Sequence, residues 1–254
     1  MKKSFLLLAS VAIFSLCCYS QSNTKSGTVM KKSPAPATLN TLSAKEKADG
    51  WKLLFDGKSA SGWHSYGRPA PGPSWKVADG TIYYDTTDER KIHDRDLVTD
   101  AEFENFDLKY EWRIAPKGNS GLLFDVHEDT TQFKQTYFTG PEMQIIDNNG
   151  HPDAKNPRHR AGDLYDLIAV TKETVRPVEE FNEAQITLNH GKLDFYLNGE
   201  HVVSTTMYDD NWNQLVAGSK FKSMPGFTKT KKGRIALQSH GSMVWFRNVK
   251  IKEL

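Results

Sequence analysis

The sequence has few cysteines, and both lie near its N-terminus. Its 254 residues include two cysteines, Cys17 and Cys18. We expect residues 1–20 to be a secretory signal peptide, because a lysine pair precedes a short apolar run and small residues follow it. Cleavage after Ser20 would leave no cysteine, which excludes disulfides and cysteine nucleophiles from the mature chain. We therefore predict an exported protein, periplasmic or secreted. The alternative is a membrane-anchored lipoprotein with its lipid on Cys18.

The sequence also lacks a charge excess of one sign. It has 33 Lys and Arg residues against 31 Asp and Glu, a formal charge of +2. Loss of Lys2 and Lys3 with the signal peptide would bring the charge to about zero. A near-neutral exported protein is unsuited to nucleic-acid binding. No other apolar run is long enough to cross a bilayer, so we predict no membrane span.

Several motifs that hold cofactors or metals are absent. The chain has no glycine-rich phosphate loop, no Gly-x-Ser-x-Gly elbow and no His-Glu-x-x-His helix. None of its eight histidines is spaced i, i+4 from another on a plausible helix. We therefore predict no cofactor and no metal held by the protein alone. A divalent ion held partly by substrate hydroxyls would leave no motif, so that alternative stays open.

The rest of the chain divides into a linker and one domain. Residues 21–41 are rich in Ser, Thr, Lys and Pro, which predicts a flexible linker. Residues 42–254 form the predicted domain. It opens with a short helix at 44–49, because Ser43 and Glu46 have the spacing of a capping box.

Within the domain the pattern is almost entirely that of strands. Residues 106–114 alternate strictly between apolar and polar side chains, which predicts a strand with one buried face. Asp79-Gly80 and Asn198-Gly199 are typical of hairpin turns. We count roughly ten to twelve strands, with a second short helix at 210–219. This pattern predicts an all-β protein, a two-sheet antiparallel sandwich with one or two short helices.

The most informative segment is Gly140-Pro-Glu-Met-Gln-Ile-Ile-Asp147. As a strand it places Glu142 and Gln144 on one face. A β-bulge at residues 145–146 would bring Asp147 to the same face. Two carboxyl groups and an amide in a row suit proton transfer, and such rows occur on sugar-cleaving sheets. The alternative is a polar strand end that only shapes a groove.

Other polar residues are expected to join this row. The long irregular segment 148–180 is predicted to be a lid, and it carries Tyr165 and Arg158, of which Arg158 has the alternative of being merely exposed. Gln238 and His240 share one face of a C-terminal strand, where the histidine is either a proton donor or a structural group. Acids, amides and aromatic rings on a broad sheet suit a carbohydrate. The candidate substrate-binding residues are Asn119, Gln144, Tyr165, Gln238 and Arg158.

Several motifs in order resemble those of the 3-keto-disaccharide hydrolase family, which is related to concanavalin A-like lectins and glucanases. The resemblance covers about residues 50–254. Its motifs are Gly50-Trp51, Leu54-Phe55-Asp56-Gly57-Lys58, Gly62-Trp63, Asn119-Ser120-Gly121, the segment 140–147, Gly162-Asp-Leu-Tyr-Asp166, Leu197-Asn198-Gly199, Gly233-Arg-Ile-Ala-Leu-Gln-Ser-His-Gly241 and Phe246-Arg247-Asn248. It implies a jelly-roll sandwich and a substrate with a ketone at C3 of its glucose-type ring.

The resemblance also implies a reaction. A carboxylate would remove the proton at C2, the enolate would expel the aglycone from C1, and water would add back. Glu142 or Asp147 is then the base, and His240 or Tyr165 assists the leaving oxygen. Where glucanases of the broader fold have Glu-x-Asp-x-x-Glu, this chain has Glu-x-Gln-x-x-Asp, which disfavours an ordinary retaining mechanism. The alternatives are a noncatalytic lectin-like module and a glucanase acting on unoxidised glycans.

Overall fold

The computed structural model describes residues 1, 38–87 and 95–254. The predicted signal peptide, the possible lipid anchor at Cys18 and most of the predicted linker lie outside the described residues. The compact unit runs from Thr38 to Leu254. It therefore begins inside the segment for which the sequence predicts a linker. No helix among the described residues is long and apolar enough to span a membrane.

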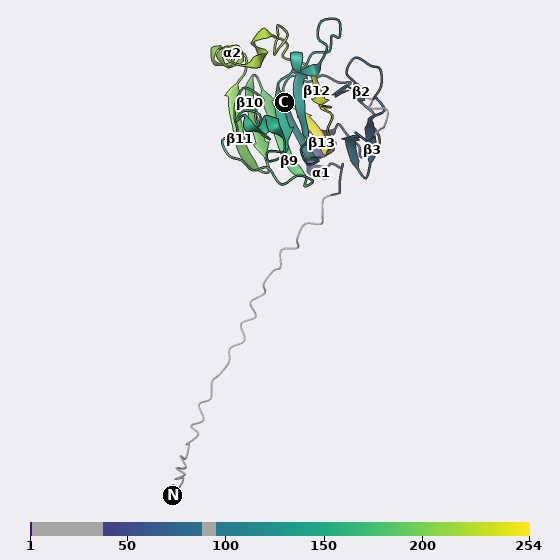
Figure 1. The fold of residues 1–254 in the computed structure, drawn as a ribbon. Helices are drawn as coiled ribbons and strands as arrows, with labels where there is room; N and C mark the ends of the chain where they lie inside the picture. The colour runs from purple at the N-terminus through teal and green to yellow at the C-terminus, as the bar shows by residue number, and fades with distance from the viewer. Residues whose placement is uncertain (2–37, 88–94) are drawn as a thin grey trace, which may run out of the picture. The chain divides into compact units, whose positions relative to one another are not determined.

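The structure confirms an all-β fold of two antiparallel sheets (Figure 1). The larger sheet has eight strands, in the order β11-β10-β9-β6-β13-β4-β3 with β1 also paired to β13. Its strands are β1 (Lys52–Leu53), β3 (Trp75–Ala78), β4 (Thr81–Tyr84), β6 (Phe106–Ile114), β9 (Asn182–Asn189), β10 (Lys192–Leu197), β11 (Glu200–Thr206) and β13 (Val244–Glu253).

The smaller sheet has five strands, in the order β2-β5-β12-β7-β8. Its strands are β2 (Trp63–Ser65), β5 (Leu97–Thr99), β7 (Asn119–Val126), β8 (Glu142–Ile146) and β12 (Arg234–Leu237). The described residues thus form thirteen strands, slightly more than the sequence predicts, because very short strands such as β1 leave no periodic pattern.

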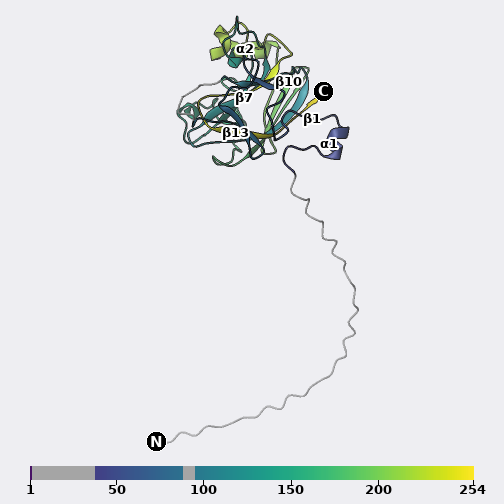
Figure 2. The same cartoon turned by 90° about the vertical axis from the view of Figure 1, so that its right-hand side faces the viewer.

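The described helical segments are short. Both predicted α-helices are present, α1 (Ala44–Ala48) and α2 (Asp210–Ala217), and they lie toward opposite ends of the sandwich (Figure 2). The capping box that Ser43 and Glu46 predict is formed at the start of α1. Three 3-10 turns complete the described helical segments: η1 (Thr136–Phe138), η2 (Pro152–Lys155) and η3 (Lys220–Ser223).

One large apolar core fills the space between the sheets. In β6 buried and half-buried residues alternate without exception, as the sequence predicts. The buried side chains of β6 meet those of β7 and β10, where Phe106, Phe124 and Phe195 pack edge to face. Because the core is formed by inward-facing side chains, the outward-facing side chains of the smaller sheet are available to line a binding site.

Strand β7 does not alternate regularly. A regular strand would place Leu123, Asp125 and His127 on one side. Instead Asp125 has a φ of 52°, and the pairing of β7 with β12 shifts register near it. As a result Leu123 and Val126 share a face, packed together in a small outer cluster.

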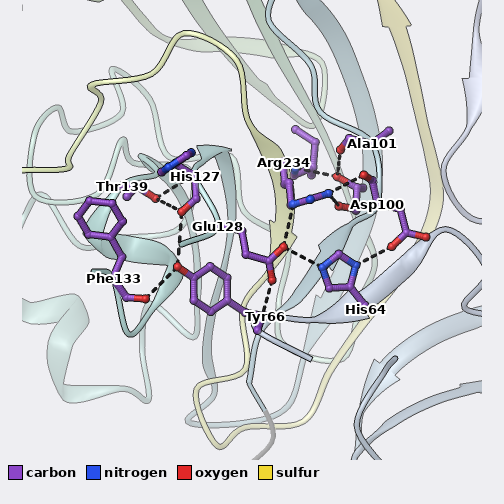
Figure 3. A network of polar contacts seen from close by, with 12 residues as sticks. His64, Tyr66, Asp100, Ala101, His127, Glu128, Phe133, Thr139 and Arg234 are labelled. Atoms are coloured by element: carbon purple, nitrogen blue, oxygen red, sulfur yellow. Dashed lines mark hydrogen bonds and ion pairs between the residues drawn. The ribbon is translucent and has the colours of Figure 1, made fainter. Parts of the chain in front are cut away.

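A polar network secures the edge of the smaller sheet (Figure 3). Glu128, which follows β7, contacts His64 Nε2 of the edge strand β2 at 2.9 Å and forms an ion pair with Arg234 Nε at 2.9 Å. The other ring nitrogen of His64 faces Asp100. These contacts join β2, the end of β7 and β12 on one side of the smaller sheet.

Candidate active site

The carboxyl group at the centre of the candidate site belongs to Glu142, the first residue of β8. Its neighbours Met143 and Ile145 point into the core, so Glu142 and Gln144 point outward, as the sequence predicts. Glu142 is nevertheless only 5% exposed. It is covered by segments that fold over the outer face of the sheet.

A glycine on the neighbouring strand makes room for this carboxyl group. Gly121 of β7 pairs with Gln144, and the Glu142 side chain lies across it. A Cβ atom at position 121 would come within 2.0 Å of Glu142 Oε1. The Asn119-Ser120-Gly121 motif is therefore part of the wall of the site, since only glycine leaves this space.

Glu142 has one direct amide partner and two charged neighbours. The Gln238 side-chain amide donates a long hydrogen bond of 3.4 Å to Glu142 Oε2. Burial raises the pKa of Glu142 to about 8, with the Lys220 ammonium group opposing and the Asp96 carboxylate adding to the rise. Glu142 therefore exchanges a proton near neutral pH, as a general acid or base must.

Asp96 is the second carboxyl group of the site. It is buried and accepts hydrogen bonds from the Thr136 hydroxyl and from the backbone N–H of Ser239, the latter at 2.7 Å. Burial raises its pKa, although these hydrogen bonds oppose the rise. Asp96 comes just before β5, in a polar stretch without periodicity, so no sequence pattern points to it.

Lys220 brings a positive charge to the opposite wall. Its ammonium group lies 4.0 Å from the ring centroid of Tyr165. Burial lowers the pKa of Lys220, while the carboxylates of Glu142, Asp166 and Asp153 oppose that change. The backbone N–H of Lys220 donates to Asp166 Oδ2 at 2.7 Å, which fixes the start of η3. Lys220 is a second functional residue without a sequence signal, because it lies far from residues 140–147 along the chain.

Contacts with Asp153 and His159 fix the position of Tyr165. Its hydroxyl group donates to Asp153 Oδ2 at 3.0 Å, and its ring lies 4.2 Å from that of His159. His159 in turn contacts Asp153 and Asp166 through its two ring nitrogens, at 2.8 and 3.0 Å. Burial, with Asp153 adding to it, raises the pKa of Tyr165 well above its ordinary value. Tyr165 is therefore a neutral, firmly oriented hydroxyl group.

These residues enclose a pocket of about 290 Å³ on the outer face of the smaller sheet. Its volume is just below the range of about 300–1,000 Å³ for small-ligand sites, which suits a small ligand rather than a long chain. Six of the residues that the sequence singles out line it: Asn119, Glu142, Gln144, Tyr165, Gln238 and His240.

The amides of this pocket differ in what they can offer a ligand. Asn119 Oδ1 is buried and has no hydrogen-bond partner among the described residues, so it can accept from a ligand hydroxyl group. Gln144 Oε1 already accepts from the backbone N–H of Ile145 at 3.0 Å, which leaves its NH2 group as a donor. His240 is exposed at the rim, near Asp96.

Asp147 does not lie in this pocket. The predicted bulge at residues 145–146 is wrong, because β8 pairs regularly with β7 as far as Ile146. Asp147 then caps a turn: its carboxylate accepts from the backbone N–H groups of Lys117, Asn149 and Gly150 at 2.8–3.0 Å. Burial opposes ionisation, but these N–H groups lower its pKa below the ordinary value. It lines a separate cavity, which the side chain of Trp112 also borders.

Arg158 also lies away from the pocket. Its guanidinium group is 3.8 Å from Asp166 Oδ1, and its side chain is 42% exposed. It does not line the cavity around Glu142. Among the described residues, Arg158 is linked to the site only indirectly: it lies near Asp166, and Asp166 accepts a hydrogen bond from the backbone N–H of Lys220.

The segment 148–180 is not a free lid. The backbone of residues 162–165 is hydrogen-bonded to β8, through Gly162 to Gln144, Gln144 to Asp163 and Tyr165 to Glu142. Leu164 and Leu167 of this segment are buried in the main core. The sequence prediction of a lid is therefore wrong, and removing this segment would expose core residues.

No three His, Cys, Asp or Glu side chains within the described ranges are arranged to hold a metal ion. The pocket instead provides two protonatable carboxyl groups, one ammonium group, one hydroxyl group and several amides. Such a set can move a proton, stabilise a developing negative charge and bind hydroxyl groups.

Comparison with known proteins agrees with this chemistry. Residues 50–252 match the model of a family described as the 3-keto-alpha-glucoside-1,2-lyase-like domain. A curated relative from Bacteroides thetaiotaomicron, the 3-keto-disaccharide hydrolase, is 32% identical over 246 residues, covering 88% of this chain and 85% of its own length.

Solved structures of similar proteins share the fold of this chain. A protein of Parabacteroides distasonis assigned as a glycosyl hydrolase superposes with a TM-score of 0.79 at 31% identity, over 85% of this chain and all of the other. A second such protein of that organism has a TM-score of 0.59 at 26% identity, over 80% and 99% of the two chains.

Proposed function

We propose that the substrate of this protein is a glycoside with a ketone at C3. The chain belongs to the 3-keto-alpha-glucoside-1,2-lyase-like family and is a glycoside-cleaving hydrolase. The observation that carries this proposal is the carboxyl group of Glu142, which is buried, has a raised pKa, and faces a polar pocket beside Lys220. In an ordinary glycoside the hydrogen bound to C2 is not acidic enough for a carboxylate to remove. A ketone at C3 acidifies the hydrogen at C2.

In the proposed first step Glu142 takes the proton from C2. The C–H electron pair forms the C2=C3 bond, and the charge moves to the C3 oxygen. A raised pKa makes the Glu142 carboxylate a stronger base than an exposed one. General base catalysis of this kind contributes roughly 10²–10⁴-fold in rate.

Lys220 is the proposed stabiliser of the enolate oxygen. Its ammonium group is close enough to Glu142 to lower the pKa of that carboxyl group, so both groups act on the same part of the pocket. A well-placed donor to a developing oxyanion contributes roughly 3–4 kcal/mol. We therefore expect replacement of Lys220 to slow the chemical step as well as to weaken substrate binding.

In the second step the enolate electrons return, forming C1=C2 and expelling the aglycone oxygen from C1. The departing oxygen needs a proton, and His240 is the proposed donor. The Tyr165 hydroxyl group already donates to Asp153 and has a raised pKa, which makes it a weak acid. Water then adds, with its hydroxyl group going to C1 and a proton to C2. The net result is hydrolysis. Asn119, Gln144 and Gln238 are the proposed partners of the sugar hydroxyl groups.

A retaining glucanase mechanism is less well supported. It needs two carboxyl groups on either side of the bond that breaks. Asp147, which sequence spacing would assign to the second role, is held by three backbone N–H groups in another cavity. Asp96, the second carboxyl group of the pocket, is buried and already accepts hydrogen bonds from Thr136 and Ser239, so it is poorly placed to attack a sugar carbon. A noncatalytic carbohydrate-binding module would have no need for a carboxyl group that titrates near pH 8.

The test is release of product from a synthetic 3-keto-glucoside, measured beside its unoxidised parent. Wild type, Glu142→Gln and a matched control, Glu102→Gln at an exposed position, would be compared. We expect release only from the keto sugar, loss of at least a hundredfold in Glu142→Gln, and no change in the control. Release from the unoxidised parent would favour a glucanase, and binding without release would favour a noncatalytic module.

A further inference from the structure

A second polar and aromatic surface lies on the other side of the sandwich. Tyr83 of β4, Trp245 of β13 and Arg113 of β6 are register partners, so they form one row across three adjacent strands. The next residues of β13, Val244 and Phe246, point into the core. The row therefore lies on the outer face of the larger sheet, whereas Glu142 lies on the outer face of the smaller one.

The row borders a groove of about 380 Å³. Its aromatic walls are Tyr83, Trp245 and Phe181, the residue that precedes β9. The rings of Tyr83 and Trp245 are nearly parallel, at 22°, with centroids 6.3 Å apart. Arg113 lies over the Trp245 ring, so the Tyr83 ring is the surface that suits the apolar C–H face of a sugar, because aromatic faces carry partial negative charge and C–H groups partial positive charge.

Two arginines line the groove, and only one of them, Arg247, has a carboxylate partner among the described residues. Arg247 Nε is 2.7 Å from Glu111 Oε2, so its charge is neutralised within the protein. Arg113 has no carboxylate or carbonyl partner among the described residues. Its guanidinium group instead lies 4.3 Å from the Trp245 ring centroid and 5.1 Å from that of Phe181.

The stacking of Arg113 defines the geometry it can offer. Aromatic contacts use the faces of a guanidinium plane, which leaves the N–H groups at its edge to bind acceptors. Arg113 Nε is itself buried, but Arg113 as a whole is only half-buried and lines the groove, so its terminal N–H groups are the ones that a ligand can reach. A planar carboxylate is the best match, since it accepts two parallel hydrogen bonds from one guanidinium group.

We infer that this groove is a second carbohydrate-binding site that takes an acidic sugar residue, with the sugar carboxylate on Arg113 and the sugar ring against Tyr83. Asp79 lines another part of the groove and disfavours a carboxylate there, which fixes the direction of the ligand. The site is independent of the pocket around Glu142. Its effect would be to hold an acidic glycan while the other face acts on a glycoside.

The test is isothermal titration of the full chain with trigalacturonate, an acidic trisaccharide, and with maltotriose, a neutral one. The variants are Arg113→Gln, Arg113→Lys and Tyr83→Ala, and Glu142→Gln serves as control for the other face. We expect wild type to bind the acidic sugar at least tenfold more tightly than the neutral one, with affinity that falls as salt rises.

Arg113→Gln should weaken binding of the acidic sugar at least tenfold. Arg113→Lys should also weaken it, because lysine keeps the charge but not the paired donors. Glu142→Gln should bind like wild type, and Arg113→Gln should keep full catalytic turnover. Thermal unfolding would verify that each variant folds. Equal binding of the two sugars, no binding of either, or wild-type affinity in both Arg113 variants would overturn the inference.

Discussion

The raised pKa of Glu142 has a consequence for stability that can be measured without any substrate. A carboxyl group with a raised pKa binds its proton more tightly in the folded than in the unfolded chain. Between pH 4.5, the ordinary value, and about 8, the value in the fold, the unfolded chain is ionised while the folded chain is still protonated. Stability is therefore lost as pH rises through this window, and the loss is complete above pH 8.

The variant Glu142→Gln removes this dependence, because an amide carries no charge at any pH. The change in pKa from 4.5 to about 8 corresponds to roughly 3–5 kcal/mol of unfolding free energy. The stability of the variant relative to wild type should rise by that amount between pH 5 and pH 9. Any constant cost of the amide cancels, since it is the same at both ends of the range.

The assay is urea unfolding of both proteins at pH 5, 6, 7, 8 and 9, followed by tryptophan fluorescence. Glu102→Gln serves as the control and should show no growing difference from wild type. A difference between Glu142→Gln and wild type that stays constant with pH would refute the account, because it would mean that Glu142 titrates in the fold much as it does in the unfolded chain.

Three further outcomes follow from the geometry of the site. The kcat/KM of wild type should rise with pH through about 8, where Glu142 becomes a base. Lys220→Met should move this rise to higher pH, since the Lys220 ammonium group lowers the pKa of Glu142. Lys220→Arg keeps the positive charge and should move the rise less. Gly121→Ala should cost about 1–3 kcal/mol in urea unfolding and reduce kcat, because the added methyl group overlaps Glu142 Oε1; unchanged kcat would contradict the assigned position of Glu142. Asp147→Ala should cost about 1–3 kcal/mol by leaving three backbone N–H groups without their acceptor, yet leave kcat/KM nearly unchanged; a hundredfold loss of kcat/KM at normal stability would return Asp147 to the reaction.

Much of the fold could be predicted because it depends on local patterns. The alternation in residues 106–114, the hairpin turn at Asp79-Gly80 and the helix cap at Ser43 each depend on a few neighbouring residues, and each is formed as expected. The outward position of Glu142 and Gln144 follows from the same period of two. These features need no knowledge of distant contacts.

The rest of the site depends on contacts between distant segments. Asp96, Lys220 and Glu142 are brought together by the order of strands in the smaller sheet and by the turn at η3, neither of which has a sequence period. The predicted position of Asp147 on the face of Glu142 is wrong, because a bulge and a turn at the end of a strand look alike in sequence. What decided between them was a set of backbone N–H groups from the neighbouring turns.

The central claim is that Glu142 removes the proton at C2, and deuterium at that position tests it most directly. A 3-keto-glucoside deuterated at C2 would be incubated in ordinary water with wild type, with Glu142→Gln and without enzyme, and the released sugar analysed by mass spectrometry. We predict that wild type releases sugar that has lost its C2 deuterium, with a slower rate than for the undeuterated substrate, and that Glu142→Gln releases almost none. Rapid release of sugar that keeps its deuterium would contradict the mechanism, because the glycosidic bond would then break without proton transfer at C2.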